Sequence, residues 1–170
     1  DLRLREMETV DTTINTVSGT QSYDLPTGYL EMRYVMYQSS PYKFLYFMAP
    51  PDFFRVYNAG ESSGTPTYYT IVGSKIYLGP IPDAAKVLEL GFFKRPTALS
   101  VTNTTNEILT NFPDLYLYAS LAESAPFLVQ DERLAVWGNL YKEGVKTANE
   151  SAQRGRESSA PLQMSTNRVV

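Results

Sequence analysis

The sequence predicts an α+β protein: an antiparallel β domain, sandwich- or barrel-like, packed beside a small helical bundle, with an extended C-terminal arm. Residues 9–96 contain short β-branched and aromatic runs separated by glycine and proline, which is typical of strands and turns. Residues 106–152 instead repeat apolar residues at spacings of three and four, as helices do. We therefore expect four segments: the end of an N-terminal bundle helix at 1–8, the β domain at 9–96, a helical hairpin at 97–152 and a flexible C-terminal arm at 153–170.

Turn residues divide the first half of the β domain into strands. Residues 9–15 and 21–25 lie on either side of Ser18-Gly19, so we expect them to form a hairpin. Residues 29–37 alternate loosely, as a half-buried strand does, and residues 42–47 are their expected antiparallel partner.

The second half of the β domain contains the clearest hairpin. Residues 67–72 and 75–78 flank Gly73-Ser74, and glycine at the first central position is what a two-residue type II′ turn requires. Residues 87–93 then return as another strand. Between the two halves, residues 53–57 follow two prolines, which predicts one short helix.

Two consecutive helices are predicted after a polar connector. Thr104 or Thr105 can cap a short helix, and Pro113 is tolerated in the first turn of the helix that follows. Pro126 ends that helix, and Asp131 can cap the last helix. Apolar residues that recur along the two longer helices predict the core of the bundle: Tyr118, Leu121, Leu128, Leu134, Trp137 and Tyr141.

The composition excludes several classes of chemistry. The chain has no histidine and no cysteine, which removes His-dependent catalysis, the common zinc sites and disulfides. Asp52 or Asp131-Glu132 leave a carboxylate-dependent hydrolase as a distant alternative, but a helix cap explains Asp131 better. We therefore expect no enzyme, no cofactor and no metal. No apolar run approaches the ~20 residues of a membrane-spanning helix, so no membrane contact is expected.

Aromatic residues are abundant enough to suggest an interaction surface. The chain has 13 tyrosines and 8 phenylalanines, and a single buried sheet face cannot hide all of those between residues 34 and 46. We take Tyr34, Tyr37 and Tyr42 as candidate contact residues between subunits. The alternative is a carbohydrate- or receptor-binding module, because aromatic faces also stack on sugars.

The C-terminal arm combines polar residues with a few apolar ones. It is polar up to Pro161 and then carries apolar side chains, for which a purely solvated tail has little need. We expect it to become ordered only on a partner, with apolar anchors and arginines that meet acidic groups. The candidate contact residues of the arm are Arg154, Arg156, Leu162, Met164, Arg168 and Val170.

Several blocks of the sequence together resemble the head-to-tail adaptor proteins of short-tailed bacteriophages, the tail tubular protein A type. The matching blocks are residues 25–33, 64–69, 78–83, 95–100 and 111–119, with Asp131-Glu132-Arg133 and Trp137. Their order and spacing carry the resemblance, which covers roughly two-thirds of the chain.

The resemblance implies a structural virion protein with no catalytic residues. It implies a helical bundle joined to a β domain, and a twelve-fold homo-oligomeric ring below the portal protein, with the tail nozzle or tail tube protein beneath. Such a protein is made in the host cytoplasm and sits in the neck or tail of the virion. Genomic DNA would pass through the lumen without specific binding, which fits a formal net charge of -3 and the lack of a basic stripe.

Overall fold

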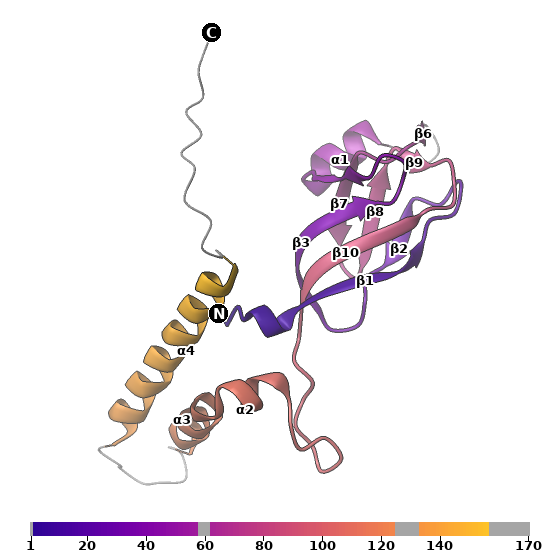
Figure 1. Ribbon diagram of the computed structural model, residues 1–170. Coiled ribbons are helices and arrows are strands. Elements are labelled where there is room, and N and C mark those ends of the chain that lie inside the picture. Colours follow the sequence, from indigo (N-terminus) through magenta and orange to yellow (C-terminus); the bar gives the residue numbers. More distant parts are fainter. Residues whose placement is uncertain (1, 58–61, 125–132, 157–170) are drawn as a thin grey trace. The chain divides into compact units, whose positions relative to one another are not determined.

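The structure is a computed structural model that describes residues 2–57, 62–124 and 133–156 (Figure 1). It is α+β, with antiparallel sheets and several helices, as the sequence predicts. The chain divides into two compact units: a β unit of residues 7–97, and a helical unit of residues 1–6 together with 98–170.

In its described residues, the β unit contains two four-stranded sheets and one small two-stranded sheet. The first sheet is antiparallel, in the order β1 (Glu8–Asn15), β10 (Val87–Lys94), β3 (Tyr29–Tyr37), β4 (Lys43–Phe44). The second has the order β2 (Ser22–Asp24), β8 (Lys75–Gly79), β7 (Tyr68–Val72), β5 (Tyr46–Phe47). Only β5 runs parallel to its neighbour in this sheet. β6 (Ser63–Gly64) and β9 (Ile81–Pro82) form the small parallel pair.

The two larger sheets share one hydrophobic core, so the β unit is a sandwich. In Figure 1, β3 and β10 of the first sheet lie in front of β7 and β8 of the second. Inward-facing side chains alternate along the strands of both sheets, as the period of two requires. The core residues are Val35, Tyr37, Leu88, Leu90 and Phe92 from the first sheet, Tyr69, Ile76 and Leu78 from the second, and Leu45 between β4 and β5.

The expected hairpin of residues 9–15 with 21–25 is wrong. β1 pairs with β10 and β2 pairs with β8, so the turn at Ser18-Gly19 carries the chain from one sheet to the other. Thr16 fixes this crossing, because its buried hydroxyl donates to the carbonyl oxygen of Ala84 over 2.9 Å and accepts from the N–H of Lys86 over 2.9 Å.

Residues 42–47 are also divided between the sheets. β4 pairs antiparallel with β3, as predicted, but β5 leaves the first sheet and pairs in parallel with β7. Leu45, at the crossing, is 6% exposed, and its burial in the core fixes the position where the chain changes sheets. The sequence does not reveal this change of sheet, because the residues before and after Leu45 both have the composition of a strand.

Other predictions for the β unit are confirmed. Val72 faces Lys75 across the two-residue turn, and Gly73 has a φ of 61°, which glycine adopts without strain. The short helix α1 (Pro50–Val56) begins with two prolines and buries Phe53. The strand expected at residues 87–93 is β10.

The helical unit contains α2 (Glu107–Asn111), α3 (Pro113–Glu123) and α4 (Leu134–Arg156). The cap of α2 is Asn106, whose Oδ1 accepts a hydrogen bond from the N–H of Leu109 over 2.8 Å. The expectation of Thr104 or Thr105 as the cap is therefore wrong. Helix α4 extends four residues beyond the predicted end at residue 152, and Asp131 and Leu128 lie outside the described residues.

The start of the chain differs from the expected end of an α-helix. Residues 2–4 are not helical, and a single 3-10 turn spans Arg5–Met7 before β1 begins. The N–H of Arg3 donates to Oδ1 of Asn149 on α4 over 2.7 Å, and Leu4 is fully buried. This segment therefore packs as an extended chain within the helical unit.

Small residues line the contact between α3 and α4. Ala148 is buried, and a Cβ added at Gly144 would lie 2.9 Å from Cδ2 of Leu115. Because the helices approach through these small residues, the larger side chains of the predicted stripe lie further out. Tyr118, Leu121 and Trp137 are half-buried, and Leu134 and Tyr141 are each 38% exposed.

Candidate interaction surfaces

Four aromatic side chains are exposed along one edge of the β unit, which we call the aromatic edge: Tyr42, Phe44, Tyr46 and Phe47. Their exposed fractions are 66%, 60%, 65% and 60%. They follow one another along the segment that contains β4 and β5, each of which is the last strand of its sheet. Exposed large apolar side chains on a strand edge are rare in isolated soluble subunits, so this edge is a candidate contact surface.

Backbone groups of the aromatic edge are held by the inner strands. The N–H groups of Tyr46 and Met48 donate to Thr67 and Tyr69 over 3.0 and 2.9 Å. Because successive N–H groups of a strand point to opposite sides, that of Phe47 points away from the sheet. The edge thus offers a hydrogen-bond donor beside its aromatic side chains.

The exposed rings rest on rings of the neighbouring strands. Phe44 packs edge-on against Tyr34 with centroids 6.0 Å apart, and Phe47 packs edge-on against Tyr69 at 5.7 Å. Tyr46 lies 6.2 Å from Tyr68. These contacts limit the rotamers of the exposed rings, which lowers the entropy lost when a partner covers them.

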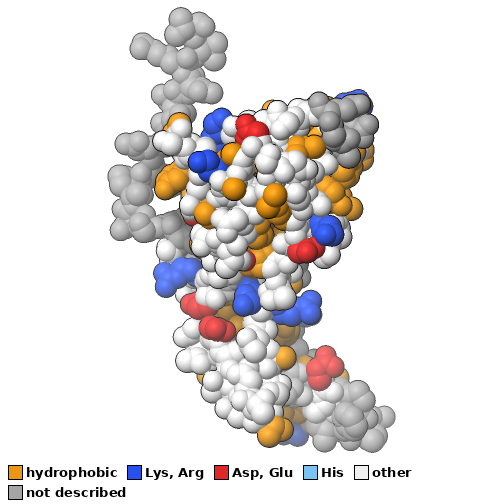
Figure 2. Space-filling view, turned by 90° about the vertical axis from the view of Figure 1, so that its right-hand side faces the viewer, with side chains coloured by type: hydrophobic (Ala, Val, Ile, Leu, Met, Phe, Trp, Pro, Cys, Tyr) orange, Lys and Arg blue, Asp and Glu red, His pale blue; other side chains and the backbone are white. Residues whose placement is uncertain are grey.

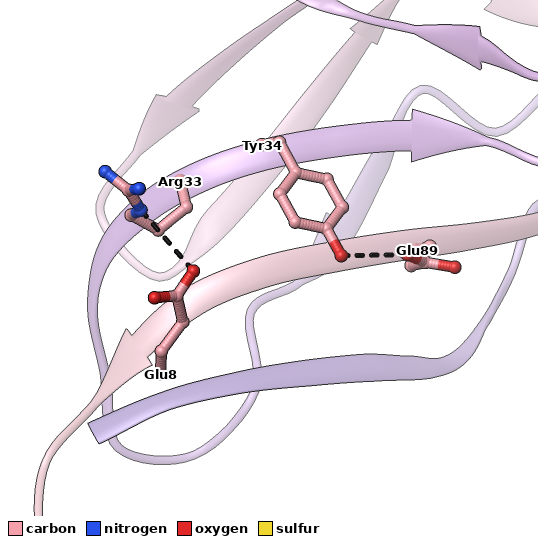
Figure 3. A network of polar contacts seen from close by, with 4 residues as sticks. All are labelled: Glu8, Arg33, Tyr34 and Glu89. Carbon is pink, nitrogen blue, oxygen red and sulfur yellow. Dashed lines mark hydrogen bonds and ion pairs between the residues drawn. The ribbon is translucent and has the colours of Figure 1, made fainter. Parts of the chain in front are cut away.

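A polar network lies on the outer face of the first sheet (Figure 3). Oη of Tyr34 donates to Oε1 of Glu89 over 2.9 Å, and Nε2 of Gln38 donates to Oε2 of the same carboxylate over 3.0 Å. Partial burial, followed by the hydrogen bond to Glu89, raises the pKa of Tyr34. Nearby, Nε of Arg33 lies 3.5 Å from Oε1 of Glu8. This network fixes Tyr34 within its own subunit.

The three tyrosines predicted as contact residues have three different environments. Tyr42 is exposed, Tyr34 is half-buried in the network above, and Tyr37 is 2% exposed. Oη of Tyr37 donates to the carbonyl oxygen of Ala84 over 3.2 Å inside the core. Tyr37 is therefore not offered to a partner in this fold, because it shares the inward face of β3 with Val35. The period-two alternation separates Tyr34 from Tyr37, and this signal was present in the sequence.

The helical unit exposes apolar side chains along α4. Val136 is 55% exposed, and Leu134, Leu140 and Tyr141 are each close to 40% exposed. An open apolar groove of about 190 Å³ lies against this helix. Its lining residues are Leu2, Ile108, Leu115, Tyr116, Ala119, Tyr141 and Val145.

Charged residues of α4, and Arg133 directly before it, lie mostly in solvent. The guanidinium of Arg133 stacks over the ring of Trp137 at 5.3 Å, and Arg154 lies 3.6 Å from the carboxylate of Glu150. The other predicted contact residues of the arm, Leu162, Met164, Arg168 and Val170, are outside the described residues, as is the side chain of Arg156. Figure 2 shows one face of the molecule, on which charges of both signs are scattered among hydrophobic side chains.

Neither a metal cluster nor a membrane helix is found in the described part of the chain. Within residues 2–57, 62–124 and 133–156, no three His, Cys, Asp or Glu side chains gather where they could hold an ion. Over the same residues, no helix is both long and apolar enough to cross a membrane.

Exposed aromatic and apolar surfaces on a two-unit α+β subunit are features of the class of structural proteins that work by binding other subunits. The chain belongs to the SU10 adaptor protein family, whose family model matches residues 1–165. This is a family of phage head-to-tail adaptors, which confirms the resemblance seen in the sequence. A comparison with curated proteins finds no match.

Proposed function

We propose that this phage adaptor forms a ring below the portal, connects the capsid to the tail and continues the DNA channel. The observation that carries the proposal is the family match over residues 1–165. The exposed aromatic edge and the exposed apolar side chains of α4 support it, because a subunit in a ring has neighbours that cover such surfaces.

The partners follow from this position in the virion. Each copy would contact two neighbouring copies, the portal protein above and the tail nozzle or tail tube protein below. Twelve copies are the number implied by the resemblance to tail tubular protein A. The function requires binding and shape, without a catalytic group or a cofactor.

The contact residues that we propose are revised by the structure. Tyr42 remains a contact residue, joined by Phe44, Tyr46 and Phe47 of the aromatic edge. Tyr34 contributes by supporting Phe44 rather than by direct exposure. Residues 157–170, with Arg154 and Arg156 before them, remain the proposed attachment arm for the portal.

DNA should pass through the ring without being held. A channel that grips duplex DNA needs clustered Lys and Arg side chains, and the chain has 15 of these against 18 Asp and Glu. We therefore propose a lumen that is neutral or acidic. Submicromolar affinity of the purified protein for duplex DNA at physiological salt, with a steep dependence on salt, would contradict this.

One experiment tests the assembly directly. The purified protein is mixed with the portal protein of the same phage, and the mixture is examined by negative-stain microscopy and by particle mass. We expect rings of adaptor on one end of the portal. Unchanged portal particles, combined with specific binding on a glycan array, would instead support the carbohydrate-binding alternative.

A further inference from the structure

The first sheet has two free edges of different character. One edge is β4, which belongs to the aromatic edge, and the other is β1. Residues 34–51, around β4, include Lys43 and no acidic residue. β1 itself carries Glu8 and Asp11 and no Lys or Arg, and Glu8 lies 3.5 Å from Nε of Arg33 on β3. The two edges of one sheet therefore differ in charge.

Pairing register places matching side chains on the same faces of these two edges. Val10 on β1 is opposite Gly91, and Gly91 is opposite Tyr34, so Val10 lies on the outer face of the sheet. Phe44 on β4 is opposite Met36 and lies on that same outer face beside Tyr34. Val10 and Phe44 are 54% and 60% exposed. Each edge thus presents an exposed apolar side chain on its outer face.

Charged residues match in the same way on the other face. Asp11 is opposite Leu90 and Lys43 is opposite Tyr37, and both of these partners point into the core. Asp11 and Lys43 therefore lie on the core-facing side of the sheet, at its two ends. If two sheets were placed side by side, Asp11 would meet Lys43 and Val10 would meet Phe44.

We propose that β4 of one copy lies beside β1 of a second copy, so that the two first sheets continue side by side, with Phe44 against Val10 and Lys43 against Asp11. This proposal rests on the ring proposed above and names its subunit contact. A contact between two different edges is heterologous, and its repetition closes a ring when the rotation allows. A contact between two aromatic edges would instead place Lys43 near Lys43 and stop at a dimer.

The exposed area is large enough to matter for such a contact. A stable interface buries about 800 Å² on each partner, and an aromatic side chain buries about 150–250 Å². Tyr42 and Phe44, the two rings at β4, are 66% and 60% exposed and offer about 250 Å², which is about a third of one partner's share.

A bulge in β1 limits how the contact is made. Pairing of β1 with β10 shifts between Asp11 and Ile14, and Oδ1 of Asp11 accepts from the N–H of Thr13 over 2.7 Å. Bulges interrupt continuous strand pairing at sheet edges. The contact is therefore confined to the part of β1 before the bulge, and side chains carry more of it than backbone hydrogen bonds.

Cysteine cross-linking tests the contact, because the natural chain has no cysteine. The full chain carrying Val10→Cys and Phe44→Cys is assembled on the portal and treated with a short bis-maleimide. We expect a ladder of covalent oligomers on a denaturing gel, because each copy links to the next. The single variants should give no ladder, and the matched pair Val10→Cys with Val72→Cys should also give none, since the 42%-exposed Val72 lies at a hairpin in the second sheet.

The outcomes separate this contact from the proposed ring. Rings on the portal without a ladder would contradict the contact but not the ring. Covalent dimers of the Phe44→Cys single variant, or cross-links to the portal protein, would do the same. If the natural chain forms no rings on the portal, both the proposed contact and the proposed ring are contradicted.

A charge exchange supplies a second readout. Lys43→Asp and Asp11→Lys should each lower the yield of rings about fivefold, and the double variant should recover most of it. Equal melting temperatures of all variants would establish that folding is intact. A double variant that assembles no better than the single variants overturns the pairing of these two residues.

Discussion

The ring of Tyr34 lies across the backbone of Gly91, its partner in the antiparallel pair of β3 and β10. A Cβ added at residue 91 would lie 2.6 Å from both Cδ1 and Cζ of this ring, so no other residue fits without moving Tyr34. Glycine within a strand leaves backbone uncovered, and an aromatic ring from the neighbouring strand covers it. The hydrogen bond from Tyr34 to Glu89 keeps the ring in this place.

Gly91→Ala should lower the free energy of unfolding by about 1–3 kcal/mol, because the new methyl group displaces the Tyr34 ring. In a Tyr34→Ala background the same change should cost little, since nothing then occupies the space. Denaturant unfolding of the four proteins of this double-mutant cycle measures the coupling. Equal costs of Gly91→Ala in both backgrounds would show that the ring does not depend on this glycine.

The same contact distinguishes the roles of Tyr34 and Tyr42. Tyr34→Ala should destabilise the β unit by about 1–3 kcal/mol, because it uncovers Gly91 and removes the hydrogen bond that Oε1 of Glu89 accepts. Tyr42→Ala, at a side chain 66% exposed, should change stability by no more than about 0.5 kcal/mol and yet weaken ring assembly. Thermal melting and particle mass measure the two effects. Normal assembly of Tyr42→Ala would remove Tyr42 from the subunit contact.

The sequence predicted the parts of the fold that depend on neighbouring residues, and it missed those that depend on residues far apart in the chain. The turn at Gly73-Ser74 is local, and turn chemistry alone predicted it. The pairing of β1 with β10 joins residues far apart in the chain, and no local pattern reveals it. The change of sheet at Leu45 was hidden for the same reason, because it depends on a core that both sheets build.

The candidate contact residues stay predictions, and the structure shows only which of them are exposed. The excess of aromatic residues suggested an interaction surface, and Tyr42 is exposed as such a surface requires. Tyr37 was assigned to the surface because the sequence does not show which face of β3 is buried. In the helical unit, the prediction rested on a stripe of large residues and missed Gly144 and Ala148, whose small size lets α3 and α4 approach.

Buried tyrosines should make the β unit sensitive to high pH. Burial raises the pKa of Tyr69. It also raises the pKa of Tyr29, which is only half-buried. A group whose folded pKa lies above its unfolded value of about 10 binds its proton more tightly in the folded state. Its contribution to stability is therefore complete below about pH 10 and is lost as the pH rises towards the folded pKa.

The free energy of unfolding should accordingly fall as the pH rises above about 10. Tyr69→Phe, which cannot ionise, should make this decline shallower. Denaturant unfolding at a series of pH values measures the slope. The same slope for Tyr69→Phe and the natural protein would contradict the role of Tyr69.

The cap of α2 gives a test within the helical unit. Asn106→Ala should cost about 1–2 kcal/mol, because Oδ1 of Asn106 accepts from Leu109 and its Nδ2 donates to Oη of Tyr116 over 2.7 Å. Thr105→Ala is the matched control, one residue earlier and exposed, and should be nearly neutral. The melting temperatures of the two variants show which residue caps α2. A larger effect at Thr105 would restore the threonine as the cap.

Removal of residues 157–170 tests the proposed arm. The buried side chains Leu4, Leu115 and Ala148 of the helical unit are all kept when residues 157–170 are removed. A chain that ends at Arg156 should therefore keep its melting temperature and lose stable docking to the portal, because the arm is proposed to supply apolar anchors for a partner. A second truncation, which ends at residue 152, also removes the last turn of α4 and the ion pair of Arg154 with Glu150. Comparing the two truncations separates the effect of the arm from that of the end of α4. Docking is measured by sedimentation of the mixture with portal particles. If the chain ending at Arg156 docks as tightly as the full chain, residues 157–170 have no attachment role and the portal must be bound by the exposed apolar side chains of α4.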